Sequence, residues 1–137
     1  MKNKLFASLP AIILGALIAI APQTFAHACA GHDVPGACHY SALAASGVGV
    51  VIALLGVAAL FVGTRERIGL NIAVVLNSLL VLANPTVLIG VCQGAMMHCR
   101  MVMLPTLMVL GVLAIVFAAI AMVADAKSSD ASATRVR

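Results

Sequence analysis

Four long runs of apolar residues, separated by short polar segments, dominate the pattern of this chain. The runs are unbroken rather than alternating, which predicts helices and not the strands of a membrane barrel. A helix needs about 20 apolar residues to cross the bilayer core; the last three runs reach that length and the first is at the short end. We therefore predict an all-α integral membrane bundle of four transmembrane helices. The expected spans are residues 5–21, 42–63, 68–91 and 101–124, which form one domain over 1–124, and a disordered cytoplasmic tail follows at 125–137.

The first run also allows a second interpretation. Lys2 and Lys4, the apolar stretch, and the small residues Ala26 and Ala28 around His27 resemble a secretory signal peptide with its cleavage site. We expect the run to be retained as the first helix. The other three spans keep their order in either case.

Small and polar residues inside the runs predict how the helices pack. Small residues recur at every fourth position in the first two runs, which lets helix backbones approach closely in lipid. We expect this pattern to pack the bundle, with a contact between copies of the chain as the lesser alternative. The third run carries polar residues whose expected role is hydrogen bonding between helices, and its Asn84-Pro85 step predicts a kink. The small residues are Ala7, Ala11, Gly15, Ala19, Ala45, Gly49 and Ala53, and the polar ones are Asn71, Asn77, Ser78 and Asn84.

Composition and charge strengthen the membrane interpretation. The chain is 64% hydrophobic and only 9% charged, whereas globular domains carry about 25% charged residues. Of the basic residues, only Arg100 falls in the segments on one side of the predicted spans, and the remainder fall on the other. The positive-inside rule therefore predicts that both termini are cytoplasmic. This bias accounts for the net charge of +4, so no nucleic-acid partner is implied, and no acidic residue lies mid-span as a proton-coupled transporter usually needs.

All four cysteines fall in the two segments predicted to be extracytoplasmic. Cys29 and Cys38 lie in the first of these loops, and Cys92 and Cys99 lie in the second. Paired cysteines outside the cytoplasm are most often disulfides, and closing a loop of roughly ten residues stabilises a protein by about 2–4 kcal/mol. We expect pairing within each loop, Cys29 with Cys38 and Cys92 with Cys99. Pairing between the loops is the main alternative, because four cysteines allow three connectivities.

Two further chemistries remain open for the same loops. Thiolate, thioether and imidazole groups together suit copper(I) or zinc, although neither loop has the close cysteine spacing of a zinc knuckle. The possible metal ligands are Cys38, His39, Cys92, Met97, His98 and Cys99. Four spans with a cysteine pair in each outer loop also resemble the membrane oxidases that generate disulfides. Those enzymes carry a Cys-x2-Cys pair, which this chain lacks.

The second cysteine loop carries a family resemblance. The run from Leu88 to Cys92, followed by Met97-His98-Cys99 and Pro105, resembles the bacterial membrane family called domain of unknown function 4418. The resemblance covers roughly residues 10–122. It implies a four-helix membrane protein with outer cysteines, similar to small accessory membrane proteins encoded near ABC-type transport genes, and it implies no particular activity.

These observations lead to one functional expectation and two alternatives. We expect a small multi-pass protein of the bacterial cytoplasmic (inner) membrane, with no catalytic residues, that serves as an accessory subunit of a membrane complex. Its partners would be the lipid bilayer and other membrane subunits. The alternatives are a protein that handles copper or zinc at the outer face and a membrane thiol–disulfide oxidoreductase.

Overall fold

The computed structural model describes residues 2–24, 37–89 and 99–134, and the side chains of 8–24, 39–89 and 100–129. All regular structure in these segments is helical, which confirms the predicted all-α class for the described part of the chain. Four α-helices are joined or extended by short turns of 3₁₀- or π-helix. The α-helices are α1 (Lys2–Ile20), α2 (Ala37–Phe61), α3 (Thr64–Ala83) and α4 (Leu104–Thr134), and the short turns are η1 (Ala21–Gln23), η2 (Asn84–Leu88) and η3 (Cys99–Met103).

Three of the described helices are long and apolar enough to cross a membrane. They cover His39–Phe61, Thr64–Leu88 and Arg100–Ser129, while the apolar part of the first helix, Ser8–Gln23, is shorter. The first helix begins with Lys2, Asn3 and Lys4, so its apolar stretch falls below the roughly 20 residues that a full crossing needs. The protein is therefore a membrane protein with three helices of spanning length and a fourth, shorter apolar helix.

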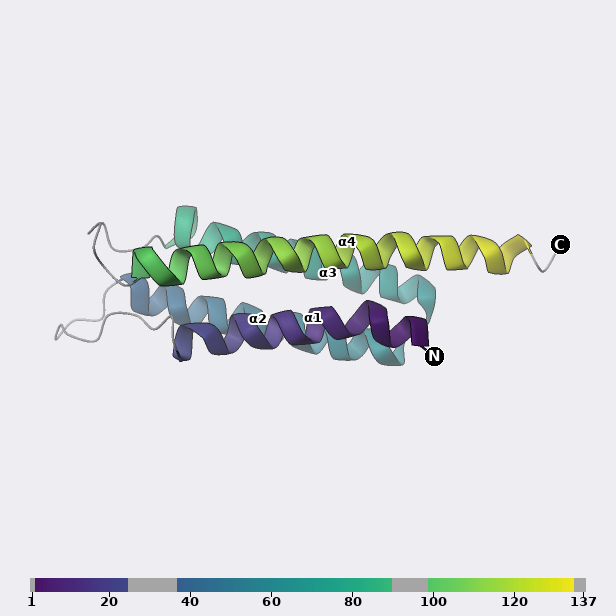
Figure 1. The fold of residues 1–137 in the computed structure, drawn as a ribbon, viewed down its shortest axis with the longest axis horizontal. Coiled ribbons are helices and arrows are strands. Elements are labelled where there is room, and N and C mark those ends of the chain that lie inside the picture. Colours follow the sequence, from purple (N-terminus) through teal and green to yellow (C-terminus); the bar gives the residue numbers. More distant parts are fainter. Residues whose placement is uncertain (1, 25–36, 90–98, 135–137) are drawn as a thin grey trace.

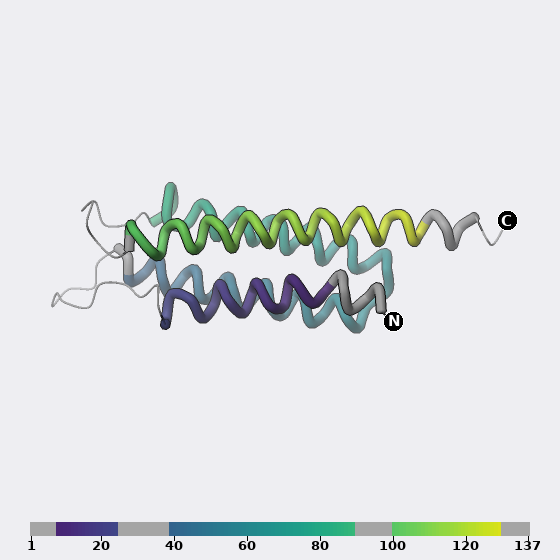
Figure 2. Tube along the Cα trace, viewed as in Figure 1, coloured from purple at the N-terminus to yellow at the C-terminus, as the bar shows by residue number. Residues whose placement is uncertain are grey.

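The helices form two antiparallel pairs that lie side by side (Figure 1). Helix α1 packs most extensively on α2, and α3 packs most extensively on α4. The start of α1 and the end of α4 lie at one end of the bundle, and the starts of α2 and α4 lie at the other, as the tube in Figure 2 also shows. The end that holds the backbones of Cys38 and Cys99 is called the cysteine end below, and the opposite end is called the arginine end after Arg67.

Glycine allows α1 and α2 to approach closely, as the spacing of small residues predicted. A Cβ placed on Gly15 would lie 2.5 Å from the backbone nitrogen of Ala53, and one on Gly49 would lie 2.5 Å from that of Ala19. Because both obstacles are backbone atoms, no side-chain movement can relieve them. The small-residue face of the first run is thus a packing face within this chain.

Three of the differences between the observed helix ends and the predicted spans bear on the functional residues. Helix α2 starts at Ala37, so Cys38 and His39 belong to its first turn rather than to a loop. Regular α-helix in α3 ends at Ala83 and gives way to the π-helical turn η2. Pro85 explains this change, because it has no N–H to donate and crowds the preceding turn.

The third difference concerns the end of α4. The sequence predicted a disordered tail from Asp125 onward, whereas α4 continues to Thr134. Asp125 is itself buried, at 6% exposed. Its carboxylate finds a partner on α3 instead of water, which explains why apolar patterning did not reveal the continuation.

Candidate functional site

The predicted disulfide and metal residues lie at the cysteine end, and most are outside the described residues. Cys29, Cys92, Met97 and His98 fall in the undescribed segments, and the side chains of Cys38 and Cys99 are likewise not described. The backbone nevertheless places Cys38 in the first turn of α2 and Cys99 at the start of η3, at the same end of the bundle (Figure 1). Disulfide pairing and metal ligation therefore stay predictions.

His39 is the one predicted metal ligand with a described side chain. It is exposed, and its ring makes an edge contact with Tyr40, with ring centroids 5.9 Å apart. Among the residues whose side chains are described, no group of three or more histidine, cysteine or acidic residues comes together as a metal site. The exposed His39 ring thus lies at the same end of the bundle as the backbones of Cys38 and Cys99.

Two hydrogen bonds tie the helices together at the cysteine end. Asn84, in the π-helical turn after α3, donates its amide to the backbone oxygen of Ser41 on α2 at 2.9 Å, in a buried position. Gln23, in the turn after α1, donates to the hydroxyl of Ser46 on α2 at 3.2 Å. The helices on either side of the first loop, and the helix that leads into the second, are thereby fixed to one another.

A shallow groove runs between α1 and α4 near the same end. Its volume is about 460 Å³, and its lining is apolar apart from one threonine. The Thr106 hydroxyl is already bound to the backbone oxygen of Val102 at 2.6 Å. The groove lining can therefore make apolar contacts, and it contains no free polar or reactive side chain. Its lining residues are Leu17, Ala21, Pro105, Thr106, Val109 and Leu110.

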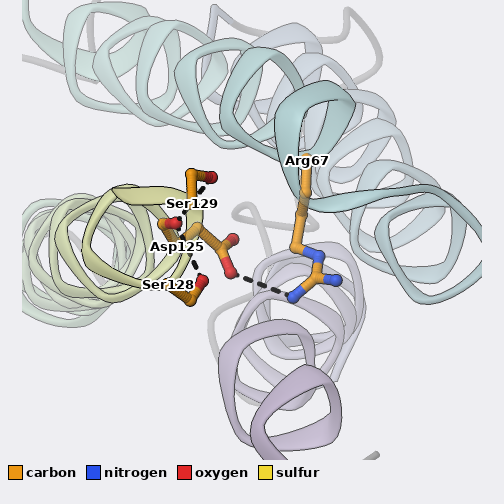
Figure 3. Close-up of polar contacts among 4 residues, drawn as sticks. All are labelled: Arg67, Asp125, Ser128 and Ser129. Atoms are coloured by element: carbon orange, nitrogen blue, oxygen red, sulfur yellow. Dashed lines mark hydrogen bonds and ion pairs between the residues drawn. The ribbon is translucent and has the colours of Figure 1, made fainter. Parts of the chain in front are cut away.

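The arginine end contains a buried ion pair that sequence analysis did not anticipate. The Arg67 Nη1 atom lies 3.1 Å from Asp125 Oδ1, and the two side chains are 2% and 8% exposed. Figure 3 shows Arg67 reaching from α3 toward Asp125 on α4. The Ser128 and Ser129 hydroxyls donate to the backbone oxygen of Asp125 at 2.9 and 3.1 Å. The pair joins α3 to α4 at the point where α4 passes the predicted end of its span.

Several polar atoms near this pair are buried without a hydrogen-bond partner. They are Arg67 Nε and Nη2, Asp125 Oδ2 and, one turn along α3, Asn71 Nδ2; Ser8 Oγ of α1 is likewise buried and unpartnered. Asn71 lies one turn after Arg67 on the same face of α3, and both are buried. Unpartnered buried donors cost free energy, so the ion pair and its surroundings carry an uncompensated cost at this position.

The signal for the ion pair was available only through helix register. Each residue looked ordinary in the sequence, because Arg67 sits near a connector and Asp125 at the edge of an apolar run. The antiparallel register of α3 and α4 brings them together. The same register places Gly111 of α4 against Leu82 and Ser78 of α3. The two helices thus keep one antiparallel alignment from this contact to the ion pair.

Comparison with known proteins identifies the family. No curated protein and no solved structure matches the chain. The model of one family, described as a domain of unknown function (DUF4418), matches residues 11–124. This match includes all of the apolar part of α1 from Ala11 onward, the cysteine loops and α4 as far as Ala124. Because the match covers most of the chain, this membrane protein belongs to the DUF4418 family.

Proposed function

We propose that this protein is a non-enzymatic accessory subunit of a membrane complex, and that the two cysteine loops form its interaction surface. The observation that supports this most directly is the buried hydrogen bond from Asn84 to Ser41. It fixes the end of α3, which leads into the second loop, to the start of α2, which follows the first. A fixed base of this kind suits two adjacent loops that present one surface to a partner.

The proposal includes a topology and a covalent framework. All four helices cross the bacterial cytoplasmic membrane, both termini are cytoplasmic, and the cysteine end faces the oxidising side. Disulfides then join Cys29 to Cys38 and Cys92 to Cys99. Each closes a short loop and would stabilise it by about 2–4 kcal/mol. The partners are other membrane subunits, with an ABC-type transport complex as the class that the resemblance suggests.

A soft-metal role is the second candidate, and one observation favours it. His39 is exposed next to Cys38, at the end where the Cys99 backbone also lies. Reduced thiolates from the two loops, with Met97 and His98, would complete a donor set for copper(I) or zinc. A thiol–disulfide oxidoreductase would use the same sulfurs. It would require that they exchange with a partner thiol or pass electrons to a quinone.

The test is co-purification of the intact chain from its native membrane under non-reducing conditions. We expect a defined partner subunit in stoichiometric amount with the wild-type chain. Replacing all four cysteines by serine should release that partner, whereas Leu76→Ala, on a side chain that is 61% exposed on α3, should leave it bound. A chain that purifies without a partner, or whose partner is retained by the serine variant but lost with Leu76→Ala, would overturn the proposal.

A further inference from the structure

One edge of the buried Arg67 guanidinium has N–H donors that take no part in the ion pair. A guanidinium presents two parallel N–H groups, from Nε and the nearer Nη atom, as a fork that matches two oxygens of an oxyanion. Asp125 occupies only Nη1, at 3.1 Å. Nε and Nη2, which form this fork, are both buried and without a partner.

Of the other unpartnered atoms at this end of the bundle, Asp125 Oδ2 is an acceptor, and two can donate. Asn71 Nδ2 lies one turn further along the same face of α3, and the Ser8 hydroxyl comes from α1. Gly56 of α2 packs against Ile12 of α1, so one turn further along this antiparallel pair Ser8 reaches the level of the last turn of α2. Helix α3 begins three residues after α2 ends, which brings Ser8 to the level of Arg67.

Charge in this region also favours an anion. The start of α3 carries Arg65, Glu66 and Arg67, and the facing part of α4 carries Asp125 and Lys127. These five groups leave one net positive charge. An anion placed against the fork would therefore meet an excess of positive charge.

We propose that the Nε–Nη2 edge of Arg67 binds a phosphate group at the arginine end of the bundle. A tetrahedral phosphate has enough oxygens to use the fork together with Asn71 and Ser8, whereas a carboxylate has only two. The phosphate comes either from the headgroup of an anionic phospholipid in the adjacent leaflet or from free inorganic phosphate. Because Arg67 is only 2% exposed, the side chains that cover the fork must move apart to admit the phosphate group.

Two arms of one experiment test the site and separate the two sources. In the first, the full chain is reconstituted in phosphatidylcholine nanodiscs with a small fraction of phosphatidylglycerol, transferred to detergent, and retained phosphatidylglycerol is counted by native mass spectrometry. In the second, delipidated protein in a neutral detergent is titrated with sodium phosphate against sodium chloride at equal ionic strength, and the Arg67 Nε–H resonance is followed by NMR. A response in the first arm alone identifies a lipid headgroup, and a response in the second alone identifies free phosphate; either supports the proposal.

Matched variants give the expected sizes of the effects. Arg67→Lys keeps the charge but removes the fork, and we expect binding to fall about tenfold or more. Arg65→Lys, two residues away and exposed, should bind within about twofold of wild type. Asn71→Ala leaves the ion pair intact and should weaken binding severalfold while the helical circular dichroism is kept, so the test survives if Arg67→Lys fails to fold. Absence of a response in both arms would overturn the proposal, and so would variants at Arg67 and Asn71 that bind as well as wild type.

Discussion

Gly49→Ala is the substitution for which the structure gives the sharpest prediction. The new Cβ would lie 2.5 Å from the Ala19 backbone nitrogen, and 2.9 Å from both the Ala19 Cα and the Gly15 oxygen. Ordinary contact for a Cβ begins at 3.4 Å, so the shortfall at the nitrogen is 3.4 − 2.5 = 0.9 Å. Since all three obstacles belong to the main chain, α1 and α2 must separate by a similar distance.

Such overpacking costs about 1–3 kcal/mol in well-packed interiors. Gly47 supplies a matched control on the same helix, because a Cβ there meets nothing within 4 Å. Gly47→Ala removes a helix-destabilising glycine and should stabilise the protein by up to about 1 kcal/mol. The two alanine variants should therefore differ in stability by about 1–4 kcal/mol, with opposite signs relative to wild type.

Reversible unfolding in mixed micelles with increasing mole fraction of sodium dodecyl sulfate, followed by circular dichroism, measures this difference. The same experiment tests whether α1 is a permanent part of the bundle. If the first helix were removed as a signal peptide, Gly49 would face no α1 backbone, and its alanine variant would behave like Gly47→Ala. Equal stabilities for the two variants would refute both the close packing and the retention of α1.

Three further predictions follow from the two ends of the bundle. Asp125→Ala leaves Arg67 as an uncompensated buried charge and should destabilise the bundle by about 3–5 kcal/mol, measured by the same unfolding assay; a loss below about 1 kcal/mol would mean that the pair is hydrated like a surface pair. Asn84→Leu removes the buried hydrogen bond to α2 and should cost about 1–2 kcal/mol, and faster hydrogen exchange at the start of α2 should accompany it; unchanged exchange would show that this bond does not fix the cysteine end. Labelling of single introduced cysteines in a cysteine-free chain should find residue 127 reactive only from the cytoplasm and residue 95 reactive only from outside; the reverse pattern would invert the topology and remove the rationale for disulfides.

Sequence patterning was sufficient for the helices because their signals are local. Unbroken apolar runs predicted four helices, and the described segments contain four α-helices. The small-residue spacing predicted the close contact that Gly15 and Gly49 make with the facing backbones. Asn84-Pro85 predicted a kink, and at this step the structure has the π-helical turn η2.

The polar contacts were harder to predict because they depend on which helix faces which. Asn77 and Ser78 donate to the backbone oxygens of Ala73 and Val74 in their own helix, since a carbonyl four residues back is always within reach. Of the polar residues in the third apolar run that were expected to bond between helices, Asn84, in η2, does so. The Arg67–Asp125 pair needed the register of α3 against α4, which no single run reveals, and for that reason Asp125 was predicted to begin a tail.

The oxidation state and metal content of the four sulfurs test the central functional proposal most directly. The protein is purified without reductant, its free thiols are counted by alkylation and intact mass, its disulfides are located by non-reducing peptide mapping, and bound copper and zinc are quantified on the same sample. The proposal predicts no free thiol, the pairs Cys29–Cys38 and Cys92–Cys99, and no stoichiometric metal. Four reduced sulfurs with one copper or zinc ion per chain would contradict it and assign the cysteine end to metal handling.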